Sequence, residues 1–451
     1  MKSKLGILTL ALAILGCAQA YALTGSWRGN LSFGGVSLPL VFNFSESTSG
    51  VTQCTMDSPN QGATGIPVSV ALCSADSVAL DCKVIGASYN GRIAGGTITG
   101  TLRQGGMSFS LTLRGEDPLE VRRPQTPKAP FTYESVDTTF TAPDGTALAG
   151  TLTMPMTAES KKIPAVVFIS GSGPQNRDEE LFEHKPFAVI ADYLARNGVA
   201  SLRYDDRGTA KSGGDFKTAT TYTFKDDARA AVDFLRTIPA IGKVGVIGHS
   251  EGGTIAFLLG ADKVPDFIIS LAGMAVPGKE TILDQNRRSL VKSGMSETDI
   301  NNSLALLSLL FDEMAHQARR GGQPTPIDVD SLVKASKITP PATVLASMKA
   351  SQKTRTPWLD VFLGLDPTPS LSKIKCPVLA INGDKDTQVD AAANLSAIKS
   401  HCKKADIRQL PALNHLLQHA TTGEVTEYPE IRETISPEVL ALILSFITRQ
   451  Q

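Results

Sequence analysis

The sequence has no excess of charge of either sign, because 44 lysines and arginines balance 44 aspartates and glutamates. A zero net charge gives no electrostatic basis for binding nucleic acid or an anionic membrane surface. The chain also lacks Cys and His residues at zinc-binding spacings, and its 42% hydrophobic content argues against extensive disorder. At 451 residues, we expect an ordered globular chain of about two to three domains.

Long hydrophobic runs are absent beyond the first residues, so we expect no integral membrane segment in the mature chain. Residues 1–22 predict an export signal, because Lys2 and Lys4 precede an apolar run at 5–16 and small-x-small cleavage sites follow it. The expected location is the periplasm or the outside of the cell. The alternative is a lipoprotein, since Leu15-Gly16-Cys17 resembles a bacterial lipobox and would place a lipid anchor on Cys17.

Cysteine is scarce, with five residues left after the export signal, and an odd number leaves at least one unpaired. In an oxidising compartment we expect disulfides between some of them. Cys376 and Cys402 should meet at the amino-terminal edge of a sheet, and Cys73 and Cys82 flank a hairpin turn. The expected pairs are therefore Cys376–Cys402 and Cys73–Cys82, with Cys54 left over.

Residues 23–121 alternate apolar and polar side chains with a period of two, as in 27–33, 36–44 and 107–113. This pattern, broken by glycine-rich turns, predicts a small antiparallel β domain that is barrel-like or a curled sheet. Residues 122–130 are rich in proline and predict a stiff linker.

From residue 131 to 451, apolar strand-like runs alternate with amphipathic segments, which predicts an α/β domain with a mostly parallel, doubly wound sheet. The alternation stops at about 276–370, where long helical candidates such as 296–320 follow one another. We interpret this stretch as a helical cap inserted between two strands, near their carboxyl ends.

The stretch Gly248-His249-Ser250-Glu251-Gly252 follows an apolar strand and opens into a helix. A strand, a sharp turn and a helix around Gly-x-Ser-x-Gly force the serine into a strained conformation and expose its hydroxyl at the carboxyl edge of a sheet. Ser250 is therefore the predicted nucleophile.

A serine nucleophile needs a base and an acid that orients the base, in the chain order serine, carboxylate, histidine. The loop after the strand 377–381 supplies Asp386, with Asp384 as the alternative, and the loop after 407–410 supplies His415, with His419 as the alternative. We favour Asp386 and His415, because Asp384 reads as a turn residue and His415 lies nearer its strand end.

The oxyanion of the tetrahedral intermediate needs two amide donors placed in advance. One predicted donor is the amide of Glu251, directly after the nucleophile. The other comes from the glycine-rich loop 171–178, where Ser172 or Gly173 is the expected donor.

Five motifs in order carry a resemblance to a known family: 170–174, 206–208, 248–253, 383–389 and 413–415. Residues 131–451 resemble secreted bacterial esterases of the α/β-hydrolase fold, related to dienelactone hydrolases and the prolyl-oligopeptidase group. The resemblance implies Ser250 as nucleophile, Asp386 as acid and His415 as base. Many relatives have His-Gly where this chain has Ser170-Gly171, so the second oxyanion donor stays open. The β domain resembles the accessory domain in front of such hydrolases.

The predicted function is a serine carboxylesterase that acts through an acyl-enzyme on Ser250, without metal or other cofactor. The expected partner is a small-molecule, glycan or lipid ester, with Leu310, Phe311, Trp358 and Phe362 as candidate pocket residues. Three alternatives stay open: a serine peptidase or aminopeptidase of the prolyl-oligopeptidase type, an acyltransferase or thioesterase, and a non-catalytic ligand-binding protein.

Overall fold

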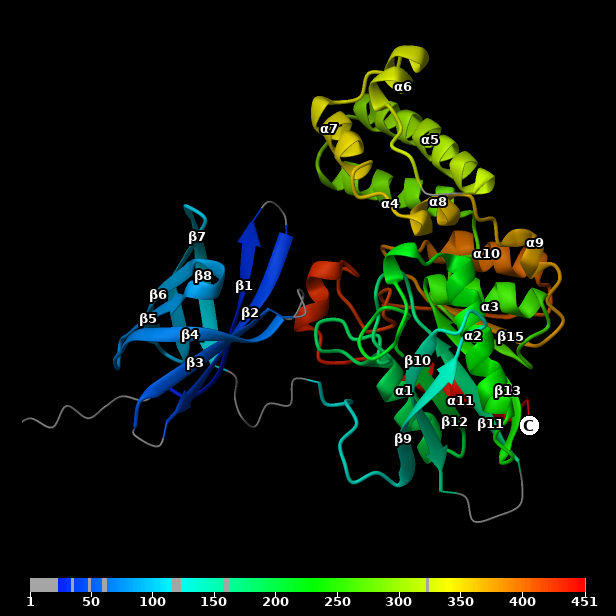
Figure 1. Ribbon diagram of the computed structural model, residues 1–451, viewed down its shortest axis with the longest axis horizontal. Coiled ribbons are helices and arrows are strands. Elements are labelled where there is room, and N and C mark those ends of the chain that lie inside the picture. The colour runs from blue at the N-terminus through cyan, green and yellow to red at the C-terminus, as the bar shows by residue number, and fades with distance from the viewer. Residues whose placement is uncertain are drawn as a thin grey trace, which may run out of the picture. The chain divides into compact units, whose positions relative to one another are not determined.

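The computed structural model describes residues 23–33, 36–47, 50–58, 63–115, 123–156, 162–321 and 324–450. The chain divides into two compact units, residues 1–121 and 122–451 (Figure 1). The expected export signal and Cys17 lie outside the described residues. Among the helices of the described part, none has the length and apolar character needed to cross a membrane.

The first unit is a closed barrel of eight antiparallel strands, in which each strand pairs with the next and β1 closes onto β8. The strands are β1 (Gly25–Phe33), β2 (Val36–Glu46), β3 (Thr52–Ser58), β4 (Ala63–Cys73), β5 (Ser77–Cys82), β6 (Ala87–Ala94), β7 (Thr97–Gln104) and β8 (Met107–Gly115). Every second residue of β5 is buried, as a strand with one face on a core requires. The prediction of a barrel-like β domain is confirmed.

The second unit contains an eight-stranded sheet in the order β16-β15-β14-β13-β11-β12-β10-β9. Its strands are β9 (Tyr133–Thr141), β10 (Ala147–Pro155), β11 (Ile163–Ile169), β12 (Ala200–Tyr204), β13 (Ile241–His249), β14 (Ile268–Leu271), β15 (Val378–Gly383) and β16 (Asp406–Leu410). The strands β9 and β10 are antiparallel to their neighbours, and all other pairs are parallel. The predicted mostly parallel sheet is confirmed.

Helices cover both faces of this sheet, and each face has its own apolar core. The helices α2 (Thr221–Arg236), α3 (Glu251–Ala261) and α10 (Ala391–His401) pack on one face, and α1 (Pro186–Arg196) and α11 (Pro437–Thr448) pack on the other. Successive residues of β11 alternate between the two cores, because side chains of a strand point to opposite faces.

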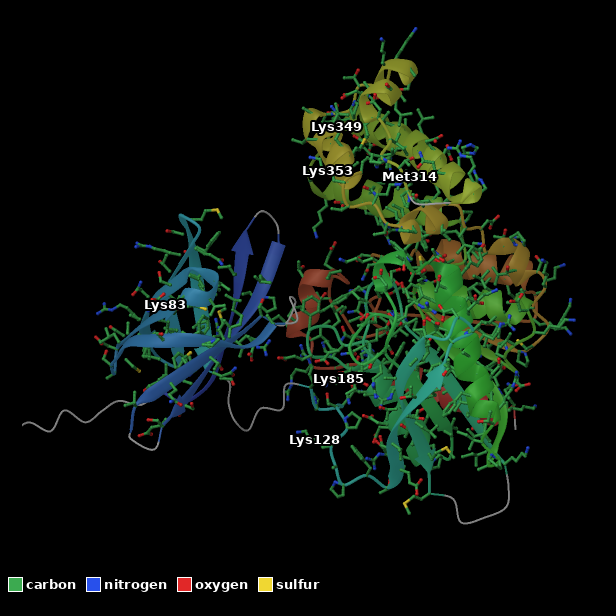
Figure 2. The ribbon with its side chains drawn as sticks, viewed as in Figure 1. Lys83, Lys128, Lys185, Met314, Lys349 and Lys353 are labelled. Atoms are coloured by element: carbon green, nitrogen blue, oxygen red, sulfur yellow. The ribbon has the colours of Figure 1, made fainter. Side chains whose placement is uncertain are left out.

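The predicted helical insertion lies between β14 and β15. It consists of α4 (Gly278–Lys292), α5 (Glu297–Arg320), α6 (Val329–Ser336), α7 (Ala342–Ser351), α8 (Pro357–Leu363) and α9 (Thr368–Leu371). Its helices enclose a separate core around Leu310, Phe311 and Met314, the last of which is labelled in Figure 2. Leu310 and Phe311, two of the candidate pocket residues, are buried in this internal core.

The segment read as a linker is attached to the second unit over its described part, residues 123–130. Arg123 is 6% exposed, and its guanidinium donates to the main-chain oxygens of Phe182, Pro429 and Ile431. The sequence pattern gave no indication of this anchoring, since it depends on carbonyl groups about 60 and 300 residues away along the chain.

All five described cysteines are free thiols, so both predicted disulfides are wrong. Cys73 pairs in register with Val78 at the start of β5, whereas Cys82 ends that strand four residues later. Four residues of strand span about 13 Å, well beyond the reach of a disulfide. Burial raises the pKa of Cys376 to about 11 and also raises the pKa of Cys402, which keeps both thiols protonated and unreactive at neutral pH.

Candidate active site

Ser250 lies in the turn between β13 and α3, with φ 53° and ψ −119°. This backbone conformation is strained for any residue other than glycine. A Cβ at Gly248 would lie 2.1 Å from the carbonyl oxygen of Gly252, and a Cβ at Gly252 would lie 2.1 Å from that of Ile169. Only glycine at these two positions lets strand, turn and helix approach so closely.

His415 and Asp386 follow β16 and β15, whose carboxyl ends lie at the same sheet edge as that of β13. His415 Nδ1 lies 2.8 Å from Asp386 Oδ2, and both side chains are buried. Asp386 Oδ1 accepts from the amides of Gln388 and Val389, each at 2.8 Å. Since a carboxylate only accepts, the His415 proton sits on Nδ1 and leaves Nε2 as the basic nitrogen.

The structure also brings His415 to the nucleophile turn. The ring of His249, the residue before Ser250, lies 4.7 Å from the His415 ring between centroids. His249 Nε2 lies 2.9 Å from the main-chain oxygen of His415. The predicted nucleophile, base and acid are therefore neighbours, although their catalytic roles stay predictions.

The two weaker candidates occupy other positions. Asp384 is exposed and accepts the amide of Ala412 at 2.7 Å, which is a turn contact. The side chain of His419 is 55% exposed and contacts Glu433 Oε1 through Nδ1 at 2.8 Å. Neither residue is part of the His415–Asp386 contact.

Two buried carboxylates hold the start of the loop after β11. The hydroxyl of Ser170 donates to Asp206 at 2.6 Å, and the amide of Gln175 donates to the same carboxylate at 3.0 Å. The amide of Gly171 donates to Glu179 at 2.7 Å. These contacts fix the loop in which the second oxyanion donor was predicted.

A third buried carboxylate, that of Glu251, joins this loop to the cap. It accepts from Ser172 Oγ at 2.8 Å, from Thr221 Oγ1 at 2.7 Å and from Trp358 Nε1 of α8 at 2.9 Å. Burial raises the pKa of Glu251, while these three hydrogen bonds act in the opposite direction. Trp358, a predicted pocket residue, thus contacts the residue that follows the nucleophile.

The amide of Gly171 already donates to Glu179, so it is not free to donate to an oxyanion. The amides of the predicted oxyanion donors differ from it in this respect. Among the hydrogen bonds of the described residues, none is donated by the amides of Ser172, Gly173 or Glu251. Gly173 has φ 97°, a conformation that favours glycine. The three amides remain the predicted donors. Within the described ranges, no cluster of three His, Cys, Asp or Glu side chains could hold a metal ion.

The sequence analysis missed the roles of the Glu179 and Asp206 side chains. Glu179 lies in the acidic run 178–180, a pattern typical of a solvated loop, yet it is 5% exposed. Asp206 belongs to the Asp206-Arg207-Gly208 motif, which was a usable signal, but nothing in the sequence placed its carboxylate against Ser170.

The family model of the X-Pro dipeptidyl-peptidases (S15 family) matches residues 144–419, which is more than half of the chain. The chain belongs to this family. It is therefore a serine hydrolase of the α/β-hydrolase fold, in agreement with the sequence-based expectation.

The chain is also similar to two curated proteins. It is 30% identical to the esterase EstD of Thermotoga maritima over 156 residues. This aligned stretch covers 35% of this chain and 36% of EstD. It is 28% identical to an acyl transferase of Photobacterium leiognathi over 123 residues. This aligned stretch covers 27% of this chain and 36% of that protein. The chain thus spans about a third of the length of these curated relatives.

Two solved structures are similar to the S15-family chain at lower identity. An esterase of Pyrococcus furiosus is 18% identical with a TM-score of 0.43, over 70% of this chain and 91% of that one. A hypothetical protein of Pseudomonas aeruginosa is 17% identical with a TM-score of 0.47, over 74% of this chain and 99% of that one.

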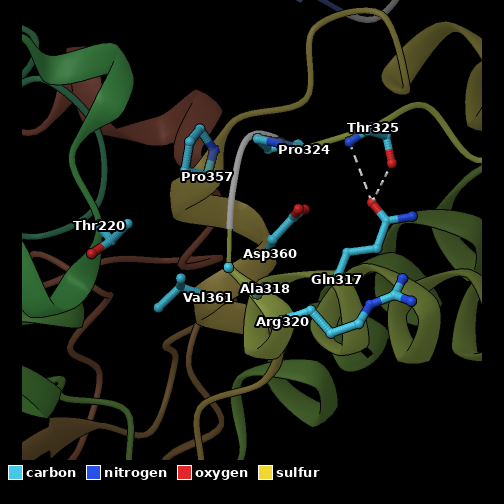
Figure 3. Close-up of a pocket in the computed structure, with 10 residues that line it drawn as sticks. Thr220, Gln317, Ala318, Arg320, Pro324, Thr325, Pro357, Asp360 and Val361 are labelled. Atoms are coloured by element: carbon cyan, nitrogen blue, oxygen red, sulfur yellow. Dashed lines mark hydrogen bonds between the residues drawn. The ribbon is translucent and has the colours of Figure 1, made fainter.

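A cavity of about 410 Å³ lies where the cap of the S15-family protein meets the start of α2 (Figure 3). Thr220 and Pro357 line it, and they directly precede Thr221 and Trp358, two partners of the Glu251 carboxylate. The cavity therefore lies next to the contact between cap and nucleophile turn.

We predict that Asp206→Asn weakens the pH dependence of stability. Burial raises the pKa of Asp206 to about 8, and the nearby Glu179 and Glu251 add to this effect. The folded chain thus keeps a proton that the unfolded chain releases near an aspartate's ordinary pKa, so the unfolding free energy falls as pH rises through this interval.

Asp206 is expected to lower the unfolding free energy of the wild type by up to about 1.4 kcal/mol per pH unit between about pH 4 and about pH 8. Urea unfolding of both proteins at several pH values measures it. The asparagine, which is isosteric with the protonated acid, should gain stability relative to the wild type as pH rises. A difference between the two proteins that does not change with pH would contradict the assignment.

Proposed function

We propose that the protein is a serine carboxylesterase that acts through an acyl-enzyme on Ser250. In the first step, His415 Nε2 takes the proton of the Ser250 hydroxyl, and the oxygen attacks the ester carbonyl. The amide of Glu251, with that of Ser172 or Gly173, donates to the oxyanion. The alcohol leaves with the proton from His415, and water then releases the acid by the same route.

The alternative supported by the family's description is a dipeptidyl-peptidase, whose substrates carry a free amino terminus. Such a substrate brings an ammonium group into the site, and a buried ammonium requires an anionic or strongly accepting partner. The residues around Ser250 must therefore offer an unsatisfied acceptor if this alternative holds.

The observation that carries the ester proposal is that the three buried carboxylates around the nucleophile turn are already occupied. Glu251 accepts from three side chains, Glu179 contacts His249 and Gly171, and Asp206 accepts from Ser170 and Gln175. These donors compete with an ammonium group for the carboxylates, whereas an ester brings no charge and needs no such partner. The similarity to a protein named as an esterase supports the same choice.

The test is a comparison of kcat/KM for p-nitrophenyl esters of graded acyl length with kcat/KM for alanyl-prolyl-p-nitroanilide. Each kcat/KM is divided by the uncatalysed hydrolysis rate of the same substrate, which corrects for the higher reactivity of the ester. We expect this corrected value to be at least about 10³-fold higher for the best ester than for the anilide. If the corrected ratio favours the anilide, the dipeptidyl-peptidase replaces the esterase as the proposed function.

A further inference from the structure

A second buried pair of histidine and carboxylate lies beside the predicted catalytic one. His249 Nδ1 lies 2.9 Å from Glu179 Oε1, and His249 Nε2 lies 2.9 Å from the main-chain oxygen of His415. His249 is 8% exposed and Glu179 is 5% exposed. The mechanism given above uses neither side chain.

Both ring nitrogens of His249 face oxygen atoms. A main-chain carbonyl only accepts, so Nε2 donates to His415. Glu179 Oε1 accepts the amide of Gly171 at 2.7 Å, and His249 Nδ1 lies 2.9 Å from the same oxygen and can donate to it. Burial acts to lower the pKa of His249, but the Glu179 carboxylate outweighs it and the pKa is raised. The raised pKa and the oxygen atoms at both ring nitrogens favour the protonated form of His249.

Among the described titratable groups, those near this pair include Asp206, on which Glu179 acts, as well as Asp386 and Tyr428. Asp386 also acts on His249, and Tyr428, whose pKa is raised by burial so that it stays neutral, bonds to the main chain of His415. A small cavity beside the pair is otherwise lined by apolar side chains: Pro186, Phe187, Ile190, Leu271, Leu416, Leu417 and Ile435. The apolar surroundings strengthen the attraction between the two charges.

The pair connects three parts of the site. His249 precedes Ser250 in the chain, it donates to the main chain of His415, and its partner Glu179 holds the amide of Gly171 in the oxyanion loop. Glu179 has φ 50°, a left-handed conformation that is uncommon for residues other than glycine. Such a conformation persists only where surrounding contacts impose it.

We propose that the Glu179–His249 ion pair is a charged clamp that positions His415 against Ser250. His249 is a positioning residue, because it acts on the reaction through His415. The rings of His249 and His415 lie 4.7 Å apart between their centroids, so the position of one constrains the other. This inference rests on the proposed serine-hydrolase function.

The test uses two variants that separate the two ends of the His249 ring. In His249→Asn the amide reaches the position of Nδ1 and Glu179 but not His415, and in His249→Gln it reaches the position of Nε2 and the His415 oxygen. The readout is the rate at which ethyl fluorophosphonate labels Ser250 across pH, which requires the nucleophile and base but no particular substrate. Glu180→Gln changes an adjacent, partly exposed carboxylate and serves as the control.

We expect His249→Asn to lower the labelling rate about 10- to 100-fold, and His249→Gln to lower it by less than about tenfold. The larger loss is expected in His249→Asn, because only the glutamine of His249→Gln keeps a donor on the His415 oxygen. The Glu180→Gln profile should stay as in the wild type.

Equal losses in the two variants would overturn the clamp and leave a packing role. If neither histidine variant folds, Glu179→Gln gives the same readout, and labelling at the wild-type rate there overturns the proposal. Wild-type labelling of Ser250 without ester turnover would reject the esterase and not the clamp. An absence of labelling would reject the serine hydrolase itself.

Discussion

Replacing Ser250 with alanine is expected to lower ester turnover on the order of 10⁴-fold or more, to the level that binding and the oxyanion donors alone sustain. The reason is that the proposed acyl-enzyme needs the Ser250 oxygen, and the His415–Asp386 pair has no other hydroxyl to activate at this turn. The measurement is kcat with the best p-nitrophenyl ester, in the same preparation that gives the melting temperature.

The fold should tolerate this change. Alanine has the same preference as serine against φ 53°, so the strain at the turn is not increased. The melting temperature is expected to stay within a few degrees of the wild type, about the effect of 1 kcal/mol in a domain of this size. A Ser250→Ala protein that melts normally and still turns over ester at the wild-type rate would exclude Ser250 as the nucleophile.

Replacing Asp386 with asparagine is expected to lower kcat by about 10³- to 10⁴-fold, because it reverses the tautomer of His415. Asp386 Oδ1 accepts two amides, those of Gln388 and Val389, so the asparagine must keep its oxygen on that side. Its NH₂ group then faces His415 Nδ1 and donates to it. The proton of the imidazole moves to Nε2, which can no longer accept the proton of Ser250.

Asp384→Asn is the matched control for this prediction. Asp384 lies two residues earlier, is exposed, and makes a turn contact with Ala412. We expect its kcat to remain within about twofold of the wild type, as for surface substitutions in general. If both asparagine variants lose the same modest factor, Asp386 does not orient the base and another carboxylate does.

The regular elements of the second unit could be predicted closely from the sequence. The strand expected at 407–410 is β16 (Asp406–Leu410), and the helix expected at 296–320 is α5 (Glu297–Arg320). The helical insertion interrupts the sheet between β14 and β15 as expected. These elements carry strong periodic patterns over their whole length. The order of serine, carboxylate and histidine along the chain was also visible, because the sheet topology makes that order meaningful.

Contacts between distant segments could not be predicted in this way. Glu179 and Glu251 are charged residues that a pattern assigns to the surface, and only the folded loops reveal that their carboxylates are buried. The proposed Cys73–Cys82 disulfide failed for a related reason, since strand register places Cys73 opposite Val78. Sequence patterns report local structure, and these features depend on pairing and packing.

The most direct test of the account is to trap the acyl-enzyme and locate it. The full chain is mixed with a p-nitrophenyl ester, quenched in acid within one turnover, and digested for peptide mass spectrometry. We predict that p-nitrophenol is released while one acyl group is added to the peptide containing Ser250, and that Ser250→Ala shows neither. Ester hydrolysis without a covalent acyl group, or with the acyl group on another residue, would contradict the assignment of Ser250 as the nucleophile.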